Sequence, residues 1–128
     1  MKSYLGKRCG AEGRSNVMIY EAGKLARPLP ARLEVVNHSP TGFEWGYNGS
    51  GPAQLALAIL CDHLGNPKLA LKFYQEFKQQ IIATIPTDYF IITDSQVNDW
   101  LKTAIGLARI RLALRAIQLE SQSEAMAG

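Results

Sequence analysis

The sequence predicts an α+β fold: a small antiparallel sheet from the N-terminal half that packs on a buried central helix, then an amphipathic helix and a long C-terminal helix. Two observations carry this prediction. Before about residue 47 the apolar stretches are short and interrupted by glycine and proline, which is typical of strands and turns. After Ser50 the apolar residues recur with helical spacing. A length of 128 residues suits one domain, which we place at residues 1–120 with a frayed tail at 121–128.

The first 47 residues contain four candidate strands, at residues 4–9, 17–20, 33–36 and 43–47. The segment 27–30 reads Arg-Pro-Leu-Pro, and proline has no backbone N–H to donate. We therefore expect this segment to be an edge or a connection rather than a central strand.

A helix is expected from about residue 52 to residue 64. Pro52 suits the first helical position, and Gly65 suits the left-handed position that ends a helix. The stretch between them has almost no polar face, so this helix must be buried at the centre of the domain. Gln54 is its one polar side chain near the start, and a buried glutamine needs hydrogen-bond partners from the preceding loop or from a ligand.

A second helix begins with the pair Asn66-Pro67 and is expected to reach about residue 84. Its apolar stripe runs through Leu69, Phe73, Phe77 and Ile81, so it is amphipathic and half exposed. Residues 89–92, Tyr-Phe-Ile-Ile, then form a short β-type run that adds one strand to the sheet.

The last helix is expected over residues 94–119, because residues 93–96 have the Thr-x-x-Gln form of a capping box. One apolar stripe of this helix consists of Val97, Leu101, Ile105, Ala108 and Leu112. A second consists of Leu107, Ile110, Leu114 and Ile117, with the 3-4-3 spacing of a coiled-coil seam. A helix that is apolar on two sides needs two partners, so we expect a homodimer through the second stripe. The alternative is that one chain buries both stripes.

Charge is distributed unevenly along the chain. The net charge is +3, and residues 1–32 hold seven of the fourteen basic residues but only two acidic ones. This asymmetry indicates either attraction to acidic or phosphate-bearing partners or simply a solvated basic face. Cys9 and Cys61 are too far apart for a paired metal motif, so we expect no metal or cofactor. No apolar run is long enough to cross a membrane and no secretory leader is evident, so we expect a cytoplasmic protein.

The stretch from Gly42 to Gly51 stands out because four of its ten residues are glycine. It delivers the chain to a helix start, where unpaired backbone N–H groups and a partial positive charge favour anions. We therefore predict a cradle for a phosphate-bearing ligand, with Arg8 and Arg14 completing the charge. The ligand-binding candidates in and after the loop are Trp45, Tyr47, Asn48, Gly49, Ser50, Gly51 and Gln54. The alternative is purely structural, since glycines also make the tight corner that a buried helix requires.

The same stretch carries a family resemblance. Residues 39–60 read SPTGFEWGYNGSGPAQLALAIL. This string resembles the GFxWGYxGSGPAQLALAxL signature of a family of small uncharacterised proteins, a domain of unknown function found in bacterial, plasmid and phage gene sets. The resemblance implies a mobile-element setting and a role either against host defence or in maintenance of the element, and it implies no mechanism.

These observations favour a binding protein over an enzyme. No catalytic set is evident, and Asp62-His63 is the nearest approach to an acid–base pair. The leading expectation is a homodimeric protein that sequesters a nucleotide-type immune signal at residues 49–51. The alternative is a protein- or nucleic-acid-binding inhibitor of a host defence nuclease complex, of the anti-CRISPR kind, that uses a basic surface.

Overall fold

The structure is a computed structural model that describes residues 1–9 and 14–127. It confirms the α+β fold, and the chain divides into two compact units, Met1–Val97 and Asn98–Gly128. The first unit holds the sheet, the buried helix and the glycine-rich loop, and the second consists of the greater part of the last helix.

The sheet has four antiparallel strands, β1 (Lys2–Cys9), β2 (Arg14–Glu21), β3 (Arg27–Pro28) and β4 (Tyr89–Thr93), in the order β3-β2-β1-β4. The two-residue strand β3 lies at one edge, as predicted from its proline. At the other edge, β4 pairs with β1, which confirms the strand expected at residues 89–92. The first and the last strand in sequence are therefore neighbours in the sheet.

The strands predicted at residues 33–36 and 43–47 are wrong, because both segments belong to an irregular loop. Arg32 has a φ of 60°, and a turn follows in which the Val35 N–H donates to the Arg32 carbonyl. Gly42 and Gly46 also have positive φ values, which a regular strand does not allow. The Gly46 N–H donates to the Ile82 carbonyl rather than to a neighbouring strand.

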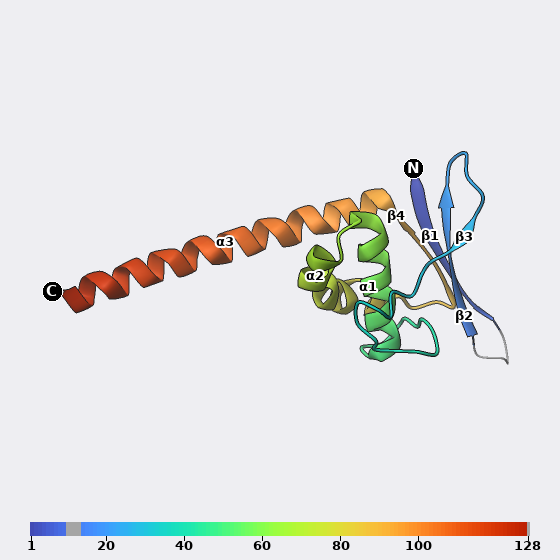
Figure 1. The fold of residues 1–128 in the computed structure, drawn as a ribbon, viewed down its shortest axis with the longest axis horizontal. Coiled ribbons are helices and arrows are strands. Elements are labelled where there is room, and N and C mark those ends of the chain that lie inside the picture. Colours follow the sequence, from blue (N-terminus) through green and yellow to red (C-terminus); the bar gives the residue numbers. More distant parts are fainter. Residues whose placement is uncertain (10–13, 128) are drawn as a thin grey trace. The chain divides into compact units, whose positions relative to one another are not determined.

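Helix α1 (Ser50–Leu64) is the buried centre of the first unit, as predicted. Every residue from Gly51 to Cys61 is buried, and Gly65 ends the helix with a φ of 62°. Helix α2 (Pro67–Gln80) starts at the predicted cap, where the Asn66 side chain accepts from the Leu69 N–H. It ends earlier than expected, and the 3₁₀ turn η1 (Ile82–Thr84) follows. Both α-helices lie on one side of the sheet (Figure 1).

Cys61 lies within α1 and is 1% exposed. Burial raises the pKa of its thiol, because the apolar surroundings disfavour the thiolate. Cys61 is thus a free cysteine that serves as a small buried apolar side chain.

Helix α3 (Asp94–Ala127) begins with the predicted capping box. The Gln96 N–H donates to Thr93 Oγ1 at 3.2 Å, and the Thr93 N–H donates to Gln96 Oε1 at 2.9 Å. The helix continues to Ala127, so most of the segment for which we expected fraying is helical.

A polar cluster ties the start of β1 to the end of α1. Lys2 Nζ and the Tyr4 hydroxyl both donate to Asp62 Oδ2, at 3.0 and 2.7 Å. Burial and the hydrogen bond to Asp62 raise the pKa of Tyr4. The Lys2 N–H donates to Asp94 Oδ2 at 3.0 Å, which adds the start of α3 to the cluster. Asp62 belongs to the Asp62-His63 pair, which is the nearest approach to an acid–base pair in the sequence. Its carboxylate thus has a structural role.

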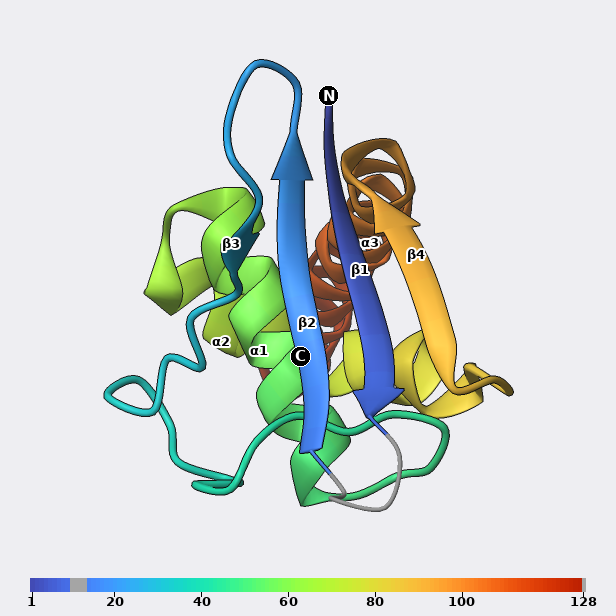
Figure 2. The ribbon, with the colours of Figure 1, turned by 90° about the vertical axis from the view of Figure 1, so that its right-hand side faces the viewer.

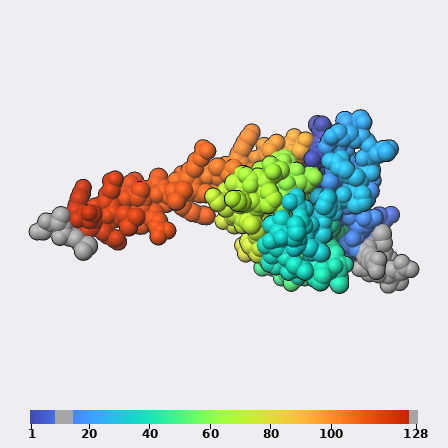
Figure 3. Space-filling view, in the orientation of Figure 1, coloured from blue at the N-terminus to red at the C-terminus, as the bar shows by residue number. Residues whose placement is uncertain are grey.

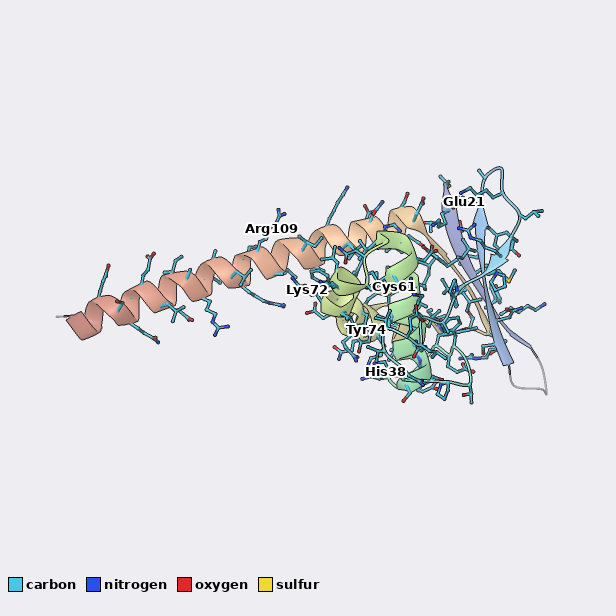
Figure 4. All side chains as sticks on the ribbon, viewed as in Figure 1. Glu21, His38, Cys61, Lys72, Tyr74 and Arg109 are labelled. Carbon is cyan, nitrogen blue, oxygen red and sulfur yellow. The ribbon has the colours of Figure 1, made fainter. Side chains whose placement is uncertain are left out.

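Glu21, at the end of β2, provides a test of the electrostatics at this end of the sheet (Figure 4). Its carboxylate contacts Lys24 at 2.7 Å and Arg27 at 3.3 Å, and these cations lower its pKa from 4.5 to about 2. A pKa lowered by folding stabilises the protein above pH 4.5, and this stabilisation is lost as the pH falls towards 2. We expect the free energy of unfolding, measured with urea, to fall less for Glu21→Gln than for wild type as the pH is lowered from 4.5 towards 2.

The matched control is Asp99→Asn, at an exposed position on α3. It should keep the wild-type pH dependence. Equal losses in wild type and Glu21→Gln would contradict the assignment.

Candidate functional site

Arg8 ties the glycine-rich loop to the sheet. Its Nε donates to Glu44 Oε1 at 3.0 Å and its Nη1 donates to Asp88 Oδ1 at 2.9 Å. Nη2 donates to the Trp45 carbonyl, and the guanidinium lies 4.8 Å from the Trp45 ring centroid. Two carboxylates therefore offset its charge and all three of its nitrogens are engaged, so these contacts give Arg8 a structural role rather than that of an anion ligand.

Trp45 lies in the core. Its ring is fully buried and packs edge-on against Phe90, with ring centroids 4.8 Å apart. Its Nε1 donates to the Thr87 carbonyl at 2.9 Å, so the indole N–H is satisfied. Phe43 is also buried, whereas Tyr47 is 51% exposed. Tyr47 is therefore the aromatic residue of the loop whose ring is accessible to a ligand.

Gly46 and Gly51 each have a local reason to be glycine, whereas a side chain at Gly49 would meet only the half-exposed ring of Tyr47. A Cβ on Gly46 would lie 2.9 Å from the Ile85 carbonyl oxygen, and its φ of 88° disfavours other residues. A Cβ on Gly49 would lie 2.6 Å from the Tyr47 ring. A Cβ on Gly51 would lie 2.6 Å from Cβ of Glu44, whose side chain thus passes across the start of α1. These contacts support the structural alternative for the glycine-rich loop.

A polar hollow of about 350 Å³ opens beside this corner. Its walls are mostly hydroxyl-bearing side chains, together with the Glu44 carboxylate. The lining residues are Ser15, Ser39, Thr41, Gly42, Phe43, Glu44, Tyr47, Ser50 and Gly51. Glu44 Oε2 accepts from Ser15 Oγ at 2.9 Å, so the carboxylate is held at this place. A carboxylate at the helix start complements the helix dipole and repels phosphate, so the hollow suits a neutral or cationic polar group better.

The structure brings together part of the predicted site. Tyr47, Ser50 and Gly51 line the hollow, and Asn48 is exposed next to them. Arg14 begins β2, but its side chain lies outside the described part of the chain. Sequence reasoning missed Glu44, although it is the one acidic residue among residues 42–51, and it missed Ser15, for which the sequence carries no signal.

Gln54 was expected to bond either the preceding loop or a ligand, and in the structure it bonds the loop. Its Oε1 accepts from the N–H groups of His38 and Ser39, at 2.8 and 3.2 Å. Its Nε2 donates to the carbonyls of Ala31 and Val36, at 2.6 and 3.1 Å. All four hydrogen-bonding positions of the amide are thus used, and none remains for a ligand.

The loop is also fixed from α2. His38 Nε2 lies 2.7 Å from the Tyr74 hydroxyl, and the two residues lie close together in Figure 4. In the space-filling view the loop, in cyan, lies directly against the green surface of the helices (Figure 3). A loop with this many anchors is a fixed part of the first unit.

The opposite face of the sheet, here the outer sheet face, forms a second candidate site. No helix of the first unit covers it within residues 1–9 and 14–97 (Figure 2). Tyr4, Ile19 and Phe90 point to the core, so the alternating residues point outward. The described outward residues of β1, β2 and β4 are Ser3, Leu5, Lys7, Asn16, Met18, Tyr20, Tyr89, Ile91 and Thr93.

An apolar row crosses the middle of the outer sheet face, because Leu5 pairs with Met18 on one side and with Ile91 on the other. Tyr20 and Tyr89 flank this row and are 46% and 65% exposed, and Ile91 itself is 58% exposed. At the free edge of β4, Ile91 also lines an apolar hollow of about 250 Å³ with Phe77, Ile81, Ile92 and Gln96. Sequence reasoning missed this surface, although adjacent apolar residues such as Tyr4 and Leu5 signal a strand that is apolar on both faces.

The described residues contain no group of three or more His, Cys, Asp or Glu side chains that would hold a metal ion. None of the helices described is both long and apolar enough to cross a membrane.

Comparison with known proteins finds one family. The model of a family of unknown function, DUF6166, matches residues 4–103. No curated protein and no solved structure matches the chain.

The corner at Gly46 provides a test of the structural reading. We expect Gly46→Ala to destabilise the protein by about 3 kcal/mol, because it adds a clash with the Ile85 carbonyl to the cost of a positive φ. Gly23 has a φ of 78° and nothing within 4 Å, so Gly23→Ala should cost only about 1 kcal/mol. Thermal unfolding of both variants measures the difference, and equal costs would show that the Ile85 contact is unimportant.

The Gln54 anchor provides a second test. Gln54→Glu places a carboxylate oxygen against the carbonyls of Ala31 and Val36, where Nε2 now donates. We expect a loss of about 3 kcal/mol of unfolding free energy in urea unfolding at neutral pH. Gln79→Glu, at an exposed position on α2, is the matched control and should change stability by less than about 0.5 kcal/mol. A small effect at Gln54 would contradict its role as the anchor of the loop.

Proposed function

The chain belongs to DUF6166, a family of unknown function, and from its own geometry we propose that it is a non-enzymatic binding protein that recognises another protein through the outer sheet face. The observation that carries this proposal is the uncovered apolar row of Met18, Leu5 and Ile91 between Tyr20 and Tyr89.

This surface has the anatomy of a protein interface. Protein interfaces combine an apolar centre, enriched in aromatic residues and methionine, with a polar rim. Here the rim consists of Ser3, Lys7, Asn16 and Thr93. The hollow at Ile91 would accept one apolar anchor side chain from the partner, which is how the strongest interface contacts are made.

Charge on the outer sheet face favours a protein over a nucleic acid. Lys7 is the one charged residue among its described outward positions, and neutralising a phosphate backbone takes several cations. The complementary partner presents an apolar patch with a carboxylate opposite Lys7. Binding should therefore depend only weakly on salt.

The nature of the target is proposed from the resemblance of residues 39–60 to mobile-element proteins. In that setting the partner is a component of host defence, and binding inhibits it. This corresponds to the inhibitor alternative, with an apolar rather than a basic recognition surface.

A small ligand at the polar hollow is the second candidate, favoured by the exposed Tyr47 ring beside a cavity of about 350 Å³. A phosphate-bearing ligand is less favoured here than a neutral or cationic one. The Glu44 carboxylate would repel phosphate, and Arg8 already pairs with that carboxylate. Gly51 is a poor position to test it, because any side chain there displaces Glu44. Tyr47→Ala is the cleaner probe.

The test compares proteins retained by immobilised wild-type chain with those retained by Ile91→Glu. We expect Ile91→Glu to weaken retention of a specific partner at least about tenfold, because a charge at the centre of an apolar interface is costly. Leu71→Glu, at an exposed apolar position on α2, is the matched control and should retain the partner. Thermal unfolding checks that each variant is folded.

Three results would contradict the proposal. Loss of the partner from Leu71→Glu as well as Ile91→Glu would indicate nonspecific capture. Loss confined to Tyr47→Ala would favour the polar hollow. Retention of nucleic acid that falls steeply as the salt concentration rises would favour the nucleic-acid alternative.

A further inference from the structure

The two edges of the sheet differ in how they are protected. Backbone N–H and C=O groups at a sheet edge attract other strands, and proteins prevent this with very short edge strands, proline and charged side chains. The β3 edge uses all three, since it consists of Arg27 and Pro28 alone. The β4 edge has five residues, with no proline, no charge and no break in its pairing with β1 (Figure 2). β4 is therefore the edge that can accept another strand.

One hydrogen bond fixes which backbone groups of β4 point away from β1. The Arg8 N–H donates to the Asp88 carbonyl at 2.9 Å. Successive residues of an antiparallel strand turn their backbone groups alternately towards and away from the neighbouring strand. Phe90 and Ile92 therefore turn theirs towards β1. Ile91, between them, presents its N–H and its carbonyl at the open edge.

The ends of β4 agree with this alternation. The Thr93 N–H donates to Gln96 Oε1 at 2.9 Å, and the Tyr89 carbonyl accepts from Thr87 Oγ1 at 2.6 Å. Both groups point away from β1, and both are already bonded within the chain. No described residue bonds the outward groups of Ile91, so the middle of the edge offers one donor and one acceptor to another strand.

The apolar hollow of about 250 Å³ lies beside the same stretch of edge. Phe77, Ile81, Ile91, Ile92 and Gln96 line it, and none of them is charged. Side chains of a strand alternate between its two faces. In a strand added beside β4, the residue opposite Ile91 would face outward and extend the apolar row of the outer sheet face. The next residue, opposite Ile92, would face the helices and enter the hollow.

Charge argues against a second copy of this chain as the added strand. Acidic residues flank β4, with Asp88 just before it and Asp94 just after it. An antiparallel second β4 that paired all five residues would place Asp88 of each copy opposite Asp94 of the other. Like charges directly opposite each other in a sheet are destabilising. A segment of a different protein, with no acidic residue at these two places, avoids this cost.

The last helix gives no comparable indication of its partner. The residues of the predicted dimer seam, Leu107, Ile110, Leu114 and Ile117, are between 46% and 61% exposed. The backbone of a helix is bonded internally, so these side chains call for an apolar neighbour of any kind. A strand edge, in contrast, calls for another strand. The homodimer stays a prediction.

We propose that the partner protein adds an extended segment to β4 as a fifth strand, antiparallel like the other pairs of the sheet. The segment bonds the outward N–H and carbonyl of Ile91. It carries two consecutive apolar residues, one on the outer sheet face and one in the hollow. In this mode of recognition main-chain hydrogen bonds give affinity and pockets for alternate side chains give specificity. The inference rests on the proposed function, and it specifies the form of the partner.

The first experiment selects random peptides of about ten residues, displayed on phage, on the immobilised full-length chain. Ile91→Pro removes the outward N–H, and proline is tolerated in an edge strand where its nitrogen faces away from the neighbouring strand. We expect Ile91→Pro to weaken the selected peptides at least about tenfold, because a peptide carbonyl loses its donor. Ile91→Val keeps the N–H and a β-branched side chain, so it is the matched control. Thermal unfolding checks that both variants are folded.

A second control separates the edge from the face of the sheet. Tyr20 lies on β2, two strands away from β4, and is 46% exposed on the outer sheet face. Tyr20→Glu should therefore leave the selected peptides bound. We also expect these peptides to contain neighbouring apolar residues and to lack acidic residues at the places beside Asp88 and Asp94.

The second experiment needs no variant of the chain. A selected peptide is synthesised with one N-methylated residue at a time, which removes one peptide N–H and keeps every side chain. Methylation should abolish binding at alternate residues, whose N–H groups face β4, and should change it less than about twofold at the residues between them. The Ile91 amide should exchange with solvent at least about tenfold more slowly in the complex.

Other results would overturn the fifth strand. They are the absence of any selected peptide, equal binding to wild type and Ile91→Pro, and N-methylation effects that do not alternate. A mass above the 14.1 kDa of one chain, in wild type but not in Ile91→Pro, would identify a second copy as the occupant instead.

Failure of the proposed function gives a different result. A cellular partner that is lost by Ile91→Glu but kept by Ile91→Pro would leave the outer sheet face as the binding surface and remove the fifth strand. A partner that is kept by Ile91→Glu would contradict the proposed function itself.

Discussion

The architecture of the first unit depends on one constraint, which is that α1 has no polar side. Every residue from Gly51 to Cys61 is buried, so each direction around this helix needs an apolar neighbour. Burial of apolar surface contributes about 25 cal/mol per Å², so an uncovered side would be costly. The sheet lies on one side, α2 packs against the helix, and the loop after β3 closes its start. Gln54 is the polar exception, and it serves to hold that loop.

This constraint also explains the glycine-rich loop. The chain must turn from the edge of the sheet into the centre of the unit, and the corner at Gly46 and Gly51 is too crowded for side chains. Arg8 fixes the corner from β1 through Glu44 and the Trp45 carbonyl. The string by which the chain resembles its family thus encodes how α1 is reached and covered. The outer sheet face lies outside this string, whereas the polar hollow beside Tyr47 is lined mostly by residues of the string.

Local signals predicted the helices well because their evidence is contiguous in sequence. Gly65 and Asn66 end one helix and start the next, and both behave as expected. The strand predicted at residues 43–47 was wrong because alternating aromatic residues also occur in an irregular loop whose glycines have positive φ. The site was only partly predicted because its partners are remote. Arg8 meets Glu44 and Asp88 across 36 and 80 residues, and no local pattern signals such a pairing.

The strand order has a consequence for how the chain folds. β1 lies in the interior of the sheet, and its partner β4 comes more than eighty residues later, with Lys7 opposite Tyr89. During synthesis the β1–β2 hairpin emerges first. Its inner face stays uncovered until α1 has been made, and its free edge stays unpaired until β4 has been made. Such distant pairings raise the contact order and slow folding. The nascent chain therefore passes through an interval in which the edge of β1 is open to pairing with other chains, and the last strand ends that interval.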